Sequence, residues 1–140
     1  MEGILNDVWE FNPSTSQWAW MGGSSTLNCA YGTLGIPAAG NIPGSRLLSF
    51  NWTDVSGNLW LFGGQGFDAN SNWNTLNDLW VFSPTKNEWT WMGGLNTLGI
   101  VPSGGGVYGT LGAPAPANQP GRPCAGTRRA ASHNGPSRSR

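Results

Sequence analysis

The chain has 140 residues, of which only 10% are charged, and its formal net charge is zero. Its length fits one domain, and it contains no run of about 18 apolar residues that could cross a membrane as a helix. The charges are divided, because residues 122–140 hold five arginines and no acid. That stretch has no aromatic side chain to stack on a base, so we expect no nucleic-acid binding.

Many glycines (22) and prolines (10), together with nine tryptophans, favour short strands and tight turns over long helices. Residues 5–11 alternate in the manner of a strand, and 12–16 form a proline-containing turn. Residues 17–21 alternate again, and Gly22-Gly23 ends the pattern. The sequence therefore predicts a β-hairpin over residues 5–23, named here the first hairpin.

A loop-like segment follows at residues 24–45, the first insert, which contains YGTLGIPAAGNIPG. Two strands are predicted next, at 46–53 and 58–63, and residues 65–75 are expected to be a connection. Strands at 78–83 and 88–92 would then complete a four-stranded antiparallel meander.

The last two strands repeat the first hairpin, because LNDVWEFNPSTSQWAWMGG at 5–23 returns as LNDLWVFSPTKNEWTWMGG at 76–94, the second hairpin. A second insert spans residues 95–121, with YGTLGAPAPANQPG at its end. We expect both inserts to be ordered, since a purely flexible linker has no reason to repeat Tyr-Gly-Thr-Leu-Gly.

This arrangement resembles kelch repeats, in the large-insert form of bacterial proteins related to the central propeller of galactose oxidase. Gly63-Gly64 match the family's glycine pair, Phe82 stands where a tyrosine is usual, and Trp89 follows at the expected spacing. Arg46 fits the arginine that opens a blade. The resemblance implies an all-β fold, a fragment of a kelch-type β-propeller with about one and a half four-stranded antiparallel blades.

In that reading residues 1–23 are the C-terminal half of one blade and residues 46–94 are a complete blade, each followed by an inserted loop. Residues 122–140 are expected to be a disordered basic tail or an out-of-frame replacement for a further blade. A propeller needs four to eight blades to hide its sheet edges. We therefore expect the chain to associate with the remaining blades of a parent propeller or with itself.

The aromatic repeat residues are predicted to fill the space between packed sheets. The repeat motif comprises Asp7, Trp9, Phe11, Trp18, Trp20, Arg46, Gly63, Gly64, Asp78, Trp80, Phe82, Trp89 and Trp91. Asp7 and Asp78 are expected to cap turns or to bind backbone amides. The aromatic residues in or beside loops are the candidates for stacking on a ligand, namely Tyr31, Trp52, Trp73 and Tyr108.

No catalytic site is predicted. The chain has one histidine, His133, whereas galactose oxidase relatives need two histidines and two tyrosines for copper. Cys29 and Cys124 are not spaced as metal ligands, and we expect both to be free thiols. The sequence therefore indicates no metal, no cofactor and no enzymatic activity.

The expected function is that of a noncatalytic module that binds a protein partner through its long loops. One alternative is an extracellular propeller that binds carbohydrate, and another is a fragment of a galactose-oxidase-like enzyme whose catalytic residues lie elsewhere. The resemblance implies that the parent protein is bacterial and secreted, with an extracellular or periplasmic location. The first residues lack the pattern of a signal peptide.

Overall fold

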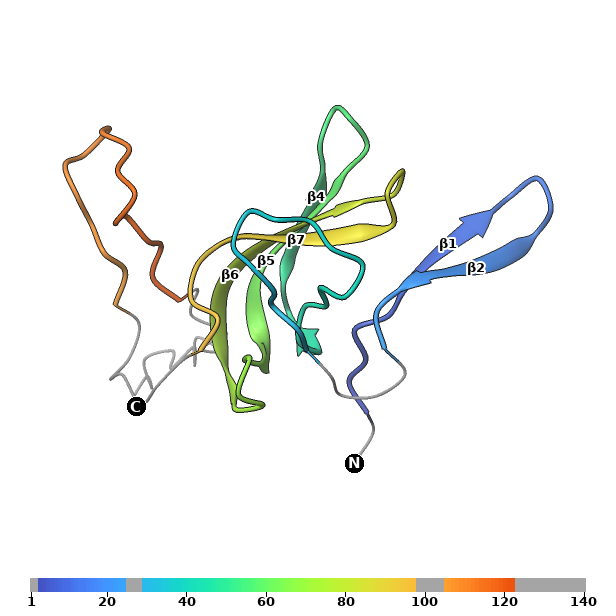
Figure 1. The fold of residues 1–140 in the computed structure, drawn as a ribbon, viewed down its shortest axis with the longest axis horizontal. Helices are drawn as coiled ribbons and strands as arrows, with labels where there is room; N and C mark the ends of the chain where they lie inside the picture. The colour runs from blue at the N-terminus through green and yellow to red at the C-terminus, as the bar shows by residue number, and fades with distance from the viewer. Residues whose placement is uncertain (1–2, 25–28, 98–104, 123–140) are drawn as a thin grey trace, which may run out of the picture.

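The computed structural model describes residues 3–24, 29–97 and 105–122, and within them the fold is all-β, with no helix and two antiparallel sheets (Figure 1). None of these residues belongs to a helix that is long and apolar enough to cross a membrane. The strands are β1 (Val8–Asn12), β2 (Gln17–Gly22), β3 (Arg46–Leu47), β4 (Phe50–Thr53), β5 (Leu59–Phe67), β6 (Trp73–Ser83) and β7 (Glu88–Gly93). The predicted all-β class is confirmed.

Strands β1 and β2 form the two-stranded sheet, which is the predicted first hairpin. Trp9 pairs with Trp20 and Phe11 with Trp18, so two aromatic pairs lie one behind the other. Their ring centroids are 6.4 and 4.9 Å apart respectively. Because the aromatic residues alternate along each strand, they lie on one face of the hairpin and pair across the strands. Such cross-strand pairs stabilise a hairpin.

The five-stranded sheet has the order β3-β5-β6-β7, and β4 also pairs with β5. The strand predicted at 46–53 is therefore broken into two pieces on the same edge of β5. Leu48 has a φ of 56° at the break, and the ladder of β5 shifts register between Phe62 and Gly64. Gly64 has a φ of +98°, and a Cβ there would lie 2.6 Å from the Leu47 oxygen. Only glycine allows so close an approach of the two strands.

Strands β5 and β6 extend farther than the sequence predicted, because Gln65–Phe67 pairs with Trp73–Thr75. The glycine- and asparagine-rich composition of this stretch suggested a connection instead. The turn itself is confined to residues around Asp68, whose carboxylate Oδ1 accepts hydrogen bonds from the amides of Asn70 and Asn72. A side chain that closes its own turn in this way allows the pairing to continue up to it.

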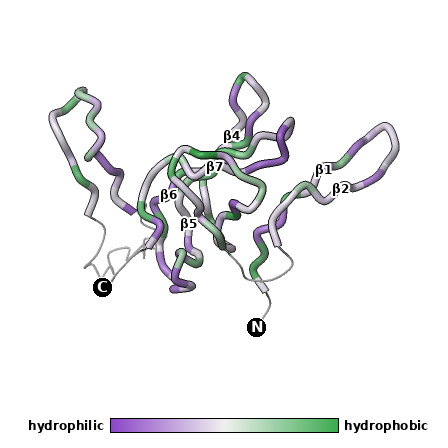
Figure 2. The backbone as a smooth tube through the Cα atoms, viewed as in Figure 1, coloured by the Kyte–Doolittle hydropathy of each residue, from purple (hydrophilic) through white to green (hydrophobic). Residues whose placement is uncertain are grey.

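The core is small and aromatic, and it lies on β6 and β7 under the first insert. It consists of buried Tyr31, Trp80, Phe82 and Trp89, with Val8 and Met21 of the first hairpin packed against it. In Figure 2 the turn between β6 and β7 is hydrophilic, which fits its place outside this core. The prediction that Phe82 and Trp89 are core residues is confirmed.

The prediction of core packing is wrong for the first hairpin. Its four repeat aromatics, Trp9, Phe11, Trp18 and Trp20, are all exposed, Trp18 to 65%. The physical reason is that the second hairpin is covered by the first insert, while no described segment covers the first hairpin in the same way.

Candidate functional site

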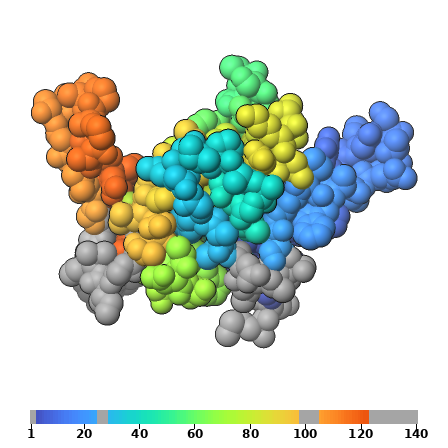
Figure 3. All heavy atoms as spheres, viewed as in Figure 1, coloured from blue at the N-terminus to red at the C-terminus, as the bar shows by residue number. Residues whose placement is uncertain are grey.

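The first insert docks on the outer edge of β7, where it appears as the cyan segment across the face of the molecule in Figure 3. It closes on itself through paired hydrogen bonds between Ala30 and Ile42. The amide of Gly35 then donates to the Trp91 oxygen at 2.8 Å. The Asn41 side chain donates to the Trp89 oxygen at 2.9 Å. An edge strand that would otherwise be open is thereby covered.

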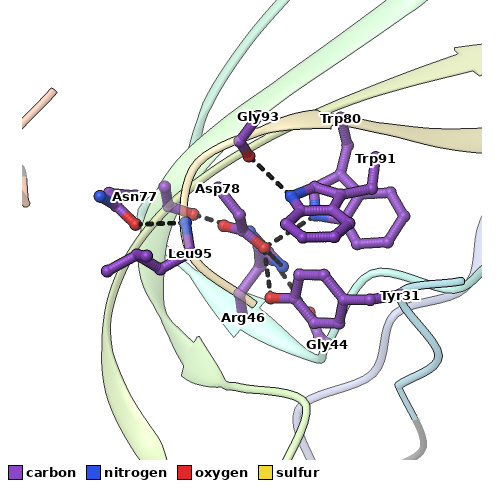
Figure 4. Close-up of polar contacts among 10 residues, drawn as sticks. Tyr31, Gly44, Arg46, Asn77, Asp78, Trp80, Trp91, Gly93 and Leu95 are labelled. Atoms are coloured by element: carbon purple, nitrogen blue, oxygen red, sulfur yellow. Dashed lines mark hydrogen bonds and ion pairs between the residues drawn. The ribbon is translucent and has the colours of Figure 1, made fainter. Parts of the chain in front are cut away.

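Beneath the insert lies a buried ion pair between Arg46, which opens β3, and Asp78 on β6 (Figure 4). The pair is bidentate, with N–O distances of 2.7 and 2.8 Å, and the two side chains are 5% and 0% exposed. Arg46 also donates to the backbone oxygens of Gly44 and Gly63. These bonds satisfy most of the fork of guanidinium donors, as a buried charge requires.

Asp78 accepts two further hydrogen bonds, both at Oδ2. The Tyr31 hydroxyl donates at 2.5 Å and the Trp80 indole N–H donates at 2.7 Å. The rings of Tyr31 and Trp80 are also in contact, with centroids 4.8 Å apart. One carboxylate therefore joins the insert, the first strand of the sheet and its central strand. The expectation that Asp78 caps a turn is wrong, because Asp78 lies within β6 and its partners are the side chains of Tyr31, Arg46 and Trp80.

The electrostatics of this cluster favour a fixed charge state. Burial raises the pKa of Tyr31, and the charge and hydrogen bond of Asp78 raise it further, so the phenol stays neutral. Burial opposes the charge of Arg46, but the hydrogen bonds and the charge of Asp78 outweigh it and the pKa of Arg46 is raised. A neutral phenol and a bidentate ion pair hold the structure together and do not supply a general base at neutral pH.

Part of this arrangement recurs in the first hairpin and at the base of each insert. The Trp9 indole donates to Asp7 at 2.6 Å, as Trp80 does to Asp78. Asn6 donates to the Pro43 oxygen at the base of the first insert, and Asn77 donates to the equivalent Pro120 oxygen at the base of the second. Each insert is thus anchored to the hairpin that precedes it. Sequence reasoning missed these asparagines, although both stand in the repeated Leu-Asn-Asp.

The four candidates for ligand stacking lie apart. Tyr31 is buried and offers no ring face to a ligand, whereas its equivalent Tyr108 is 84% exposed. Trp52 stacks on Trp60, with ring centroids 5.8 Å apart and planes at 6°. Trp73 lies at the other end of β5, edge-on to Phe67. The structure therefore brings together no single aromatic platform from these four residues.

Metal-ligating side chains do not gather in the described part of the chain, where no group of three or more His, Cys, Asp or Glu could hold an ion. Cys29 is a free thiol whose Sγ donates to the Asp68 oxygen. Burial, together with the charge of Asp68, raises its pKa, which disfavours the reactive thiolate. His133, Cys124 and the predicted tail at 122–140 lie, apart from Arg122, outside the described residues.

A scan of the chain against models of known protein families found no match, and a search of the curated proteins found none either.

Proposed function

We propose that this chain is a noncatalytic module of a kelch-type β-propeller and that its function is to bind protein. The observation that carries the proposal is the aromatic surface of the first hairpin, whose Trp9, Phe11, Trp18 and Trp20 are exposed side by side. Contiguous exposed apolar surface of this kind marks interaction sites in soluble proteins. Tryptophan and other aromatic residues are also enriched at the centres of protein interfaces.

The kelch-type part of the proposal is supported by the order of the strands. With β3 and β4 taken as two halves of one strand, the larger sheet is a four-stranded antiparallel meander like one propeller blade. Gly63 and Gly64 lie within the second strand of this meander, β5, and Arg46 is the first residue of its first strand, β3. The first hairpin then corresponds to the last two strands of the preceding blade, whose burial in a propeller would depend on neighbours.

Carbohydrate binding is the second candidate, favoured by the stacked pair of Trp52 and Trp60. Trp52 is exposed on its sheet edge and its ring is held parallel to that of Trp60. A flat indole surface with its orientation fixed suits stacking on an apolar sugar face. This site is separate from the first hairpin, so the two candidates can be tested independently.

The test uses a photo-reactive phenylalanine analogue placed at Trp18 or, as a control, at Val55, which is fully exposed in a turn. We expect covalent adducts with protein at position 18 and few at position 55. Equal labelling at both positions would contradict a protein-binding surface on the first hairpin. A glycan array run with the unmodified chain and with Trp52→Ala tests the alternative, which requires signal that Trp52→Ala abolishes.

A further inference from the structure

We propose that copies of this chain bind head to tail, with residues 105–121 of one copy docked on the outer edge of β2 in the next copy. The inference rests on the proposed protein-binding function and names its partner, a second copy of this chain. It follows from the docking of the first insert on β7. The molecule contains a second insert and another hairpin of the same sequence pattern, and these two are not in contact with each other.

The docked contact has four hydrogen bonds that cross between insert and hairpin. The backbone amides of Gly35 and Ala38 donate to the oxygens of Trp91 and Trp89, and the side chains of Asn41 and Tyr31 donate to Trp89 and Asp78. The Tyr31 ring also packs against Trp80 and Trp91, with centroids 4.8 and 5.4 Å away. Every one of these residue types recurs in the second insert or in the first hairpin.

The second insert already has the conformation of the docked one. Paired bonds between Val107 and Gln119 repeat those between Ala30 and Ile42. Three further hydrogen bonds of the first insert have an equivalent in the second. In the first insert they run from Ile36 N to Thr33 O, from Asn41 N to Ala38 O and from Asn41 Nδ2 to Ile36 O. In the second insert they run from Ala113 N to Thr110 O, from Asn118 N to Ala115 O and from Asn118 Nδ2 to Ala113 O. The element is therefore preorganised, which lowers the entropic cost of binding.

This preorganised element exposes the tyrosine ring that its counterpart buries. Tyr108 is 84% exposed, whereas the equivalent Tyr31 is only 4% exposed. The inner side of the loop forms an open concavity of about 700 Å³, lined by residues that include Tyr108, Gly112 and Asn118. In the first insert the equivalent residues, Tyr31, Gly35 and Asn41, hold the hairpin edge. The concavity of the second insert is thus the counterpart of an occupied site.

The first hairpin has the matching surface. Its register pairs Trp9 with Trp20 and shifts next to Val8, as the register of β6 and β7 pairs Trp80 with Trp91 and shifts next to Leu79. The Trp20 indole donates to the Gly22 oxygen at 2.7 Å, as Trp91 does to Gly93. Strand β2 belongs to a two-stranded sheet, so among the described residues no strand pairs with its outer edge.

The two surfaces lie too far apart to meet within one copy. Figures 1 and 3 show the second insert, in orange, and the first hairpin, in blue, at opposite ends of the long axis of the molecule. Contact between them requires two molecules. Because the two surfaces differ, the contact is heterologous, and each added copy presents a free end until a ring closes. Assemblies larger than a dimer are therefore expected.

The arginine of the docked site has no equivalent at the same position after the second insert. Arg46 stands two residues after Gly44, whereas the second insert has Arg122 directly after Gly121. Asp7 in the partner copy would therefore receive Tyr108 and Trp9 as donors without an arginine placed as Arg46 is. We expect the intermolecular contact to be weaker than the intramolecular one and to depend on protein concentration.

The test is sedimentation of the purified 140-residue chain over a wide concentration range. We expect the average mass of the wild type to rise with concentration beyond that of two chains. Tyr108→Ala changes a side chain that is 84% exposed and should weaken association at least tenfold. Trp52→Ala is the matched control, since it removes an exposed aromatic outside the docking surfaces and should leave association unchanged.

A mixing experiment tests the direction of binding. Tyr108→Ala disables the insert. The double variant Asp7→Ala/Trp20→Ala disables the hairpin, because it removes the acceptor for the Tyr108 hydroxyl and the indole against which that ring would pack, so each variant alone should be monomeric. Mixed together they should form a heterodimer and nothing larger, because only one intact insert and one intact hairpin remain. A wild type that stays monomeric, equal effects of Tyr108→Ala and Trp52→Ala, or no heterodimer would each overturn the proposal. Photo-crosslinking at position 18 to other proteins would still support protein binding.

Discussion

Replacing Asp78 with Asn should be the most damaging conservative change in the described structure. The substitution keeps the size of the side chain and leaves an acceptor for the Trp80 indole. It removes the carboxylate that faces Arg46, which is only 5% exposed and would keep its charge with backbone oxygens as its remaining partners. Breaking one half of a buried ion pair costs about 3–5 kcal/mol. We expect a loss of that size in the free energy of unfolding.

Asp7→Asn is the matched control, because Asp7 holds the same place in the first hairpin and accepts from Trp9 in the same way. Among the described residues no arginine pairs with Asp7 as Arg46 pairs with Asp78, and the Asn side chain can still accept the indole bond, so the loss should be about 1 kcal/mol or less. Both variants are made in a Tyr108→Ala background, so that assembly does not contribute. Urea unfolding, followed by tryptophan fluorescence, gives the free energy of unfolding of each variant. A stabilising osmolyte is present in all samples so that the destabilised variants are still folded before urea is added.

A loss below about 1 kcal/mol for Asp78→Asn would refute the reasoning, because an unpaired buried guanidinium cannot be that inexpensive. Equal losses for the two variants would refute it as well, since the difference between the sites lies in the ion pair and the Tyr31 hydroxyl. In either case the docking of the first insert would have to depend on contacts other than this cluster.

The remaining predictions concern the glycine pair, the core and pH. Gly64→Ala should cost more than about 2 kcal/mol, since a Cβ there meets backbone, whereas Gly57→Ala, at φ +81° in open space, should cost about 1 kcal/mol in the same urea assay. Trp89→Ala should cost about 3–5 kcal/mol and the exposed Trp18→Ala less than about 1 kcal/mol. The pKa of Tyr31 is raised above its ordinary 10.0, so its contribution is complete below pH 10 and is lost as pH rises further. Tyr31→Phe should remove that part of the alkaline loss, and an unchanged alkaline profile would contradict it.

Much of the fold could be predicted because the strands carry their own local signals. Alternating aromatic residues in Trp18-Ala19-Trp20 and in its repeat predict strands, and the proline-containing turns predict hairpins. The sequence repeat showed which residues of the two hairpins are equivalent, and it also indicated that the inserts are ordered. The break at Leu48 and the extension of β5 and β6 were missed, because both depend on pairing between strands and not on local composition.

The candidate site could be predicted only in its parts. Arg46 and Asp78 were recognised as repeat residues, but they lie far apart in the sequence, and nothing local shows that they form an ion pair. Tyr31 was taken as a loop residue that could face a ligand, because tyrosine beside glycine says nothing about which surface covers it. The exposure of Trp9 and Trp18 could not be read from the sequence for the same reason: identical motifs have different surroundings.

The measurement that tests the central claim most directly is hydrogen exchange of two equivalent amides, Gly35 and Gly112, read by NMR after quenching. The Gly35 amide donates to the Trp91 oxygen, so it should be protected at every protein concentration. The Gly112 amide should exchange rapidly in dilute protein, become protected as the concentration rises, and lose that protection in Tyr108→Ala. Rapid exchange at Gly35 would contradict the docking of the first insert on β7. Concentration-independent exchange at Gly112 would contradict head-to-tail binding by the second.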